Sequence, residues 1–240
     1  SFGINDPIFN KDLGFYFFQL PVYHILVNGL LSAVILAVVV TGGIYFLTGS
    51  FQFVNGQLQL TSYARNHLSV LAGLFFVGKG VSYYLNGFGL LYNTNGIIYG
   101  AAYTDVHVRL LVLRGLTVIA LLVGLIFFSQ AYRNRKLLLG SLILWLGVSI
   151  IGGAIVPEII QQWIVAPNEY ARELPYIKNH ITMTRAAYDL DKFEERNFPA
   201  SSQLSWDDIA DNQATINNIR LWDPRLILQT YKQLQEMRPY

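Results

Sequence analysis

The chain has 240 residues, of which 53% are hydrophobic and only 13% are charged. An ordinary soluble domain carries about 25% charged residues, so the composition argues against a chain that lies wholly in water. The net charge of +2 gives no indication of a nucleic-acid partner. The complete absence of cysteine excludes disulfides, thiolate catalysis and cysteine-ligated metals.

The first 22 residues are rich in aromatic side chains, including Phe15 to Phe18. Aromatic rings favour the headgroup level of a membrane, so residues 1–22 are predicted to form an interfacial segment. The alternative is that they are the outer start of the first span. Because Ser1 is not a methionine and no signal peptide follows it, we expect the chain to begin inside a longer polypeptide.

Four apolar windows follow, each long enough to cross a hydrocarbon layer, which takes about 20 helical residues. They run over residues 23–46, 67–85, 108–130 and 137–156. A soluble bundle would need polar faces at helical spacing, and the first and third windows offer almost none. The predicted fold class is therefore all-α, with four transmembrane helices over residues 23–166 and a mostly helical tail.

The turn at residues 132–136 carries Arg133, Arg135 and Lys136. Short basic loops stay in the cytoplasm, so this turn is predicted to be cytoplasmic, and the N-terminal segment and the tail extracytoplasmic. The membrane would be the inner (plasma) membrane of a bacterium, or a thylakoid membrane in a photosynthetic host.

The tail, residues 167–240, is predicted to be a soluble segment of short helices belonging to a larger domain. Pro175 suits the first turn of a helix, and Ser205 suits a helix cap. Asp223 followed by Pro224 is the clearest helix start. The helix that it opens should bury a face containing Ile227, Tyr231 and Leu234.

Small residues recur along two of the predicted spans, and such stripes let membrane helices approach closely. We expect a helix-packing seam, within this protein or with a partner, and the alternative is that glycine is simply tolerated in lipid. The seam residues are Gly29, Ala33, Ala37, Thr41, Gly73 and Gly80.

Lys79 lies inside the second apolar window, where an ammonium needs a polar partner or must reach toward the interface. Pairing with Asp105 or Glu158 is one interpretation, with Tyr83 one turn away on the same face. Further polar residues gather at the start of the third window, where Asp105 and Arg109 have ion-pair spacing. The predicted outward-facing polar pocket contains Lys79, Tyr83, Asp105, His107, Arg109, Arg114 and Glu158. It would suit an anion, a lipid headgroup or an acidic protein segment, and the alternative is a helix cap with interfacial anchors.

Catalytic and cofactor signatures are missing from the sequence. It has no phosphate-binding loop, no dinucleotide fingerprint, no serine-hydrolase elbow and no metalloprotease helix. The histidines His24, His67, His107 and His180 are too far apart for a local metal site. We therefore predict no catalytic residue, no metal and no cofactor, with a bound lipid and the ligation of a pigment by a single histidine left open.

Several stretches resemble a known family. These stretches are Asp6-Pro7-Ile8-Phe9, residues 15–21, residues 102–107, Pro167-Asn168-Glu169, residues 175–177, residues 184–188 and residues 215–225. Together they are similar to the UPF0182 family of large, uncharacterised bacterial integral membrane proteins. The resemblance implies a longer parent with further membrane helices and a large extracytoplasmic region, and it implies no activity.

Three functions follow from these observations. The first is a scaffold, assembly factor or accessory subunit that binds other membrane proteins as well as the lipid bilayer. The second is a transporter or lipid-handling protein that uses the polar pocket. The third is the membrane anchor of an extracytoplasmic enzyme. We favour the first, because the seam is present and catalytic motifs are absent.

Overall fold

The computed structural model describes residues 2–54, 57–94, 99–129, 134–194, 196–197, 204–220 and 222–235. The chain divides into two compact units, Ser1–Asp191 and Lys192–Tyr240, and each is treated by itself. The first unit contains four helices that are long and apolar enough to cross a membrane, which confirms the predicted all-α class.

The first of these helices consists of a π-helical turn, Phe15–Gln19, and α1, Leu20–Leu47. The second is α2, Ser62–Gly89, followed by a 3-10 turn, Leu90–Tyr92. The third opens with a π-helical turn, Asp105–Arg109, and continues as α3, Leu110–Phe128. Each one contains the window predicted for it apart from the third, which ends two residues earlier.

The fourth helix is much longer than predicted. It begins with α4, Arg135–Gly147, and helical structure then extends far beyond residue 156. The following segments are π-helical Val148–Ile155, α5 Val156–Ile160, π-helical Gln161–Val165, 3-10 Ala166–Asn168 and α6 Glu169–Ala187, with a short 3-10 turn at Leu190–Lys192.

Two details of the fourth helix correct or complete the sequence prediction. Pro175 lies inside α6 and not in its first turn, because α6 already begins at Glu169. Proline has no N–H to donate to the carbonyl of Ala171, and both residues are exposed. At the other end, the Asn134 side chain caps α4 by accepting from the Lys136 and Leu137 N–H groups at 3.2 and 3.4 Å. Arg133 of the basic turn lies outside the described residues.

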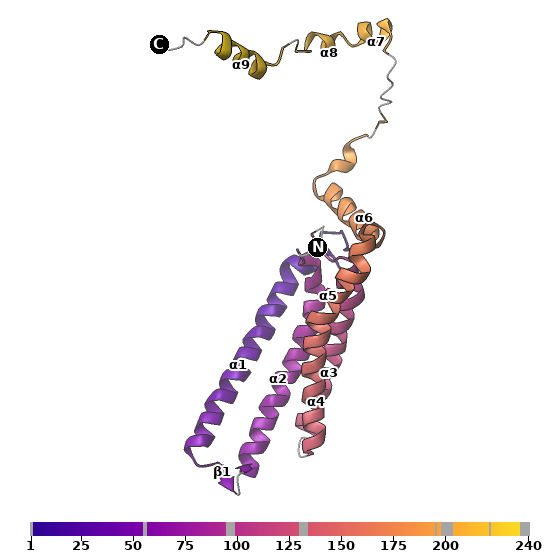
Figure 1. Ribbon diagram of the computed structural model, residues 1–240. Coiled ribbons are helices and arrows are strands. Elements are labelled where there is room, and N and C mark those ends of the chain that lie inside the picture. Colours follow the sequence, from indigo (N-terminus) through magenta and orange to yellow (C-terminus); the bar gives the residue numbers. More distant parts are fainter. Residues whose placement is uncertain are drawn as a thin grey trace, which may run out of the picture. The chain divides into compact units, whose positions relative to one another are not determined.

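A two-stranded antiparallel hairpin lies between α1 and α2. Strand β1, Phe51–Val54, pairs with β2, Gln57–Leu60, from Phe51 opposite Leu60 to Val54 opposite Gln57. The hairpin closes one end of the unit, and the N-terminal segment lies at the other end (Figure 1).

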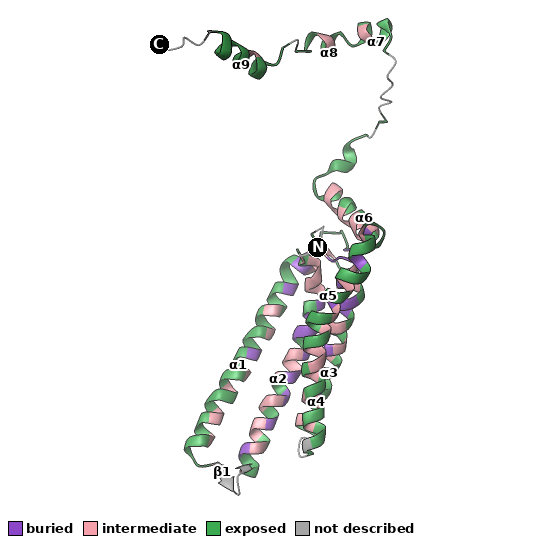
Figure 2. Ribbon diagram, in the orientation of Figure 1, coloured by how far each residue is buried: buried purple, intermediate pink, exposed green. Residues whose placement is uncertain are grey.

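The core of the first unit is built on α2. Tyr83 on α2 forms one buried cluster with Leu116 and Ala120 on α3, against which Trp145 of α4 packs. A second cluster joins Tyr16, Leu20 and Leu85 where α1 begins. Elsewhere α1 is mostly exposed (Figure 2). Its less exposed positions are 20, 24, 27, 31, 34, 37, 41, 42 and 45, mostly at the spacing of three and four residues that is typical of one helix lying along another.

The second unit contains α7, Trp206–Asp211, α8, Gln213–Asn217, and α9, Pro224–Gln235. The predicted starts at Ser205 and Pro224 are confirmed. Ser205 and Asp208 form a capping box, and the Ser205 hydrogen bonds hold the pKa of Asp208 below its ordinary value. Of the α9 face that is predicted to be buried, Ile227 is half-buried, whereas Tyr231 and Leu234 are exposed in the described part of the chain.

Candidate functional site at the polar end of the helices

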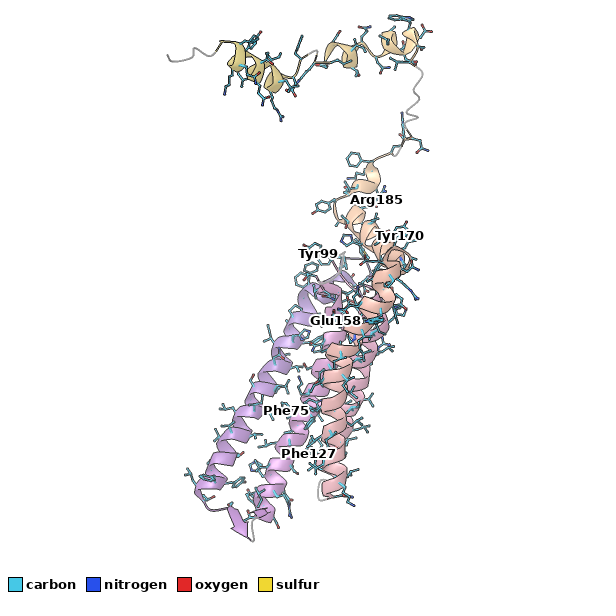
Figure 3. The ribbon with its side chains drawn as sticks, in the orientation of Figure 1. Phe75, Tyr99, Phe127, Glu158, Tyr170 and Arg185 are labelled. Atoms are coloured by element: carbon cyan, nitrogen blue, oxygen red, sulfur yellow. The ribbon has the colours of Figure 1, made fainter. Side chains whose placement is uncertain are left out.

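Polar side chains gather at one end of the first unit, where the N-terminal segment meets residues 92–94, 99–109 and 161–176. This region is called the polar end below, and Figure 3 shows Tyr99 and Tyr170 there. Three carboxylates are buried in it, namely Asp6, Asp105 and Glu173, each no more than 4% exposed. Because a buried charge is costly unless it is hydrogen-bonded, the partners of these three groups define the site.

Asp6 organises the N-terminal segment. Its carboxylate accepts from the N–H groups of Ile8, Phe9 and Lys11 at 2.9, 2.6 and 2.9 Å. The Tyr16 hydroxyl donates to it at 2.7 Å. The segment is therefore folded back onto the start of α1.

Asp105 organises the loop before α3. Asn93 Nδ2 donates to its two carboxylate oxygens at 2.9 and 2.7 Å, and the Ala102 N–H donates at 3.1 Å. Arg109 Nη1 completes the set at 3.0 Å, which is the i, i+4 ion pair expected from the sequence. The carboxylate thus joins the end of α2 to the start of α3.

Glu173 joins the same loop to α6. Its two carboxylate oxygens accept from the Tyr103 N–H at 3.3 and 3.1 Å. The Arg172 guanidinium lies 5.2 Å from the centre of the Tyr103 ring, and Thr104 donates to the side-chain oxygen of Gln161. The loop is therefore bound to the fourth helix at two separate places.

His107 takes part in this contact. Its ring stacks on Tyr103 with 4.2 Å between the ring centres. Its Nδ1 lies 3.2 Å from both the Tyr103 carbonyl oxygen and the Tyr176 hydroxyl. These contacts make His107 a connector between α3 and α6.

Arg114 lies in a different place from these groups. It lines a pocket of about 220 Å³ together with Lys11, from the N-terminal segment, and Tyr83, from α2. The remaining walls are aromatic or aliphatic and comprise Phe9, Tyr84, Gly87, Phe88, Leu110 and Leu113. The pocket brings two cations together against an apolar lining.

Lys79 and Glu158 occupy two further positions. The Lys79 ammonium lies 4.7 Å from the centre of the Tyr83 ring, a cation–π contact. In the part of the chain that the structure describes, Lys79 makes no ion pair. Glu158 is exposed on α5 (Figure 3), where it accepts from Gln162 Nε2 at 3.0 Å. The seven predicted pocket residues are thus distributed over separate locations.

The predicted seam residues also fall into two groups. On α2, a Cβ added at Gly73 would lie 2.9 Å from the Phe128 ring, and one at Gly80 would lie 3.1 Å from Leu121. Both glycines therefore lie at the contact with α3. On α1, a Cβ added at Gly29 meets nothing within 4 Å, and Ala33 is exposed. Ala37 and Thr41 are half-buried, and the Thr41 hydroxyl donates to the Ala37 carbonyl at 2.6 Å.

The histidines serve separate contacts. His67 Nδ1 lies 2.8 Å from the Tyr45 hydroxyl, and His180 lines an apolar pocket of about 370 Å³ with residues from the N-terminal segment and α6. Within the described ranges, no three His, Asp or Glu side chains are placed to hold a metal ion.

Sequence reasoning missed two residues of this end. The sequence predicts a soluble tail at Glu173 and an interfacial segment at Lys11. Only the tertiary fold brings each of them to residues far away in the chain, to Tyr103 and Arg114 respectively. The isolated position of Lys11 within an aromatic stretch is the one signal that the sequence offers.

Comparison with known proteins agrees with the resemblance noted in the sequence. The chain is 46% identical over its full length to a UPF0182 protein of Desulforamulus reducens, and 42% to one of Pelotomaculum thermopropionicum. It spans 26% of the length of each of these relatives. No solved structure matches it. The model of an uncharacterised protein family, UPF0182, matches residues 1–240, and the chain belongs to that family.

Proposed function

We propose that this chain is a membrane scaffold, which holds other transmembrane helices against the open face of α1. The observation that carries the proposal is the small-residue stripe at Gly29 and Ala33, which faces open space. In lipid, close approach through small residues is a main source of helix association. The helices bound there would belong to the rest of a parent protein or to another membrane protein of a larger complex.

The arrangement of the ends supports a topology for this scaffold. The N-terminal segment and α6 lie at the polar end, whereas the start of α4 and the β hairpin lie at the opposite end (Figure 1). With the basic turn 132–136 in the cytoplasm, the polar end is extracytoplasmic. A membrane-impermeant thiol reagent should leave the variant Asn134→Cys unlabelled in intact cells. The natural chain has no cysteine to interfere, and labelling at Asn134 would reverse the topology.

The scaffold is tested by purifying the protein from membranes in a mild detergent. We expect a stoichiometric membrane-protein partner, or tight association with the remaining helices of the parent chain. The double variant Gly29→Leu/Ala33→Leu should lose that association, because two large side chains keep the partner backbone away. The matched control is Leu30→Ala, which changes an exposed residue beside the stripe. A monodisperse protein with no partner, and with α1 unprotected from cross-linking, would contradict the proposal.

A second candidate is transport or lipid handling. Lys79 favours it, because the described residues give its ammonium a ring contact and no ion pair, which is unusual inside an apolar helix unless the charge serves a function. Lys79→Met should then abolish uptake or lipid binding while expression stays normal. Unchanged uptake would remove this candidate and leave the scaffold untouched, because Lys79 lies on α2 and the open stripe on α1.

A further inference from the structure

The pocket between α2, α3 and the N-terminal segment brings together two cations that lie about one hundred residues apart in the chain. Lys11 and Arg114 both line it. In the described ranges neither forms an ion pair with a carboxylate. The acidic residues closest to Lys11 in sequence, Asp6 and Asp12, already accept hydrogen bonds from backbone N–H groups. Asp6 accepts from three backbone N–H groups, and Asp12 accepts from Phe2, Gly3 and Gly14 N–H.

Arg114 lies well inside the apolar part of α3. It is nine residues beyond Asp105, a rise of about 14 Å along the helix. A guanidinium at such a depth needs an anionic partner or contact with the interface. Helical side chains lean toward the N-terminus of their helix, and the N-terminus of α3 is at the polar end. The Arg114 side chain is therefore directed toward the level of Lys11.

The surroundings of the two cations are apolar. Phe88, Leu110 and Leu113 form part of the lining. Leu111 and Val118 share the exposed helical face of Arg114 and are 61% and 56% exposed. A ligand seated here meets positive charge at one end and hydrocarbon at the other.

We propose that this pocket binds a phosphate ester, namely the headgroup phosphate of an anionic phospholipid. The phosphate lies between Lys11 and Arg114, and an acyl chain runs along Leu111 and Val118. A guanidinium suits phosphate because it can donate two parallel hydrogen bonds. Free phosphate shares this chemistry. The apolar strip formed by the exposed side chains of Leu111 and Val118, on either side of Arg114 along α3, favours a lipid.

The test is a lipid titration of the intact protein, followed by native mass spectrometry. Phosphatidylglycerol should bind, and the double variant Lys11→Gln/Arg114→Gln should bind it about 30-fold more weakly, with about a fivefold loss for each single change. The exchange Lys11→Arg/Arg114→Lys keeps both charges and should keep the binding, which separates loss of charge from loss of fold. Lys178→Gln, an exposed cation on α6, is the matched control.

Inorganic phosphate provides the second arm of the experiment. It should fail to displace phosphatidylglycerol at equal concentration, because it gains nothing from the apolar strip. Displacement by inorganic phosphate would overturn the lipid assignment. Equal lipid affinity in the wild type and the double glutamine variant would overturn the site itself. If the glutamine variant does not fold, the two single variants and the charge-conserving exchange decide the same question.

Discussion

Helices α1 and α2 are equally long, with 28 residues each, yet they are packed very differently. In α1 only Leu20 and Leu31 are buried, whereas α2 has nine buried residues. The less packed helix is the more apolar of the two. Apolar character thus governs which segment enters lipid. It does not govern which segments pack together, because a leucine side chain gains no hydrophobic energy when it leaves lipid for a neighbouring helix.

Small and weakly polar residues account for the difference. Gly73 and Gly80 let α3 approach α2 closely, and the Ser69 hydroxyl donates to the Phe127 carbonyl of α3 at 3.1 Å. Helix α1 has its buried cluster at its beginning. The Tyr16 hydroxyl, just before α1, donates to Asp6, and the Tyr16 carbonyl accepts from the Tyr92 hydroxyl at 2.9 Å. Farther along, α1 meets α2 at separate points, such as Leu31 beside Gly78 and Tyr45 at 2.8 Å from His67 Nδ1.

The largest expected effect concerns the Asp6 hydrogen bonds at the beginning of α1. Replacing Asp6 by alanine leaves three backbone N–H groups and the Tyr16 hydroxyl without their acceptor. We expect a loss of about 3 kcal/mol, seen as rapid hydrogen exchange over residues 2–14 and in the first turns of α1. Asp6→Asn, which keeps one acceptor oxygen, should lose less. Unchanged hydrogen exchange would show that contacts other than those of Asp6 hold the first turns of α1.

A smaller effect should distinguish the closely packed contact between α2 and α3 from the open face of α1. At Gly124 on α3, an added Cβ would lie 3.0 Å from Val77 and 3.2 Å from the Gly73 carbonyl oxygen of α2. Gly124→Leu should therefore destabilise the fold by about 2 kcal/mol through overpacking. Gly43→Leu, at an open position of α1 outside the Gly29 and Ala33 stripe, should change it by less than about 0.5 kcal/mol. Equilibrium unfolding of the purified protein in detergent measures both, and equal effects would contradict the comparison.

The smallest effect concerns the hydrogen bond between α2 and α3. Ser69→Ala removes the donor to the Phe127 carbonyl and should cost about 0.6 kcal/mol, the average for such bonds in membranes. Ser32→Ala, on an exposed position of α1, is the matched control and should have no measurable effect. Equilibrium unfolding in detergent measures both variants. A loss of unfolding free energy for Ser32→Ala as large as that for Ser69→Ala would contradict the prediction.

The sequence predicts the helices well and their contacts poorly. Four spans follow from apolar length, and the Asp105–Arg109 pair follows from helical spacing. The small residues of α1, at positions 29, 33, 37 and 41, do not all coincide with its less exposed positions. Residues four apart are rotated by about 40° around the helix at each step, so the stripe turns away from a fixed face. The hairpin could have been found from the alternation of glutamine and leucine over residues 57–60. The pairing of Lys11 with Arg114 in one pocket depends on tertiary structure alone.

The backbone at Asn168 leaves helical geometry, with φ −139° and ψ 49°, between two helical stretches. The loop before α3 contacts both sides of this joint, through Thr104 to Gln161 before it and through Tyr103 to Glu173 after it. The two contacts tie the loop to the helical stretches before and after Asn168, so this one loop braces the fourth helix on both sides of the break.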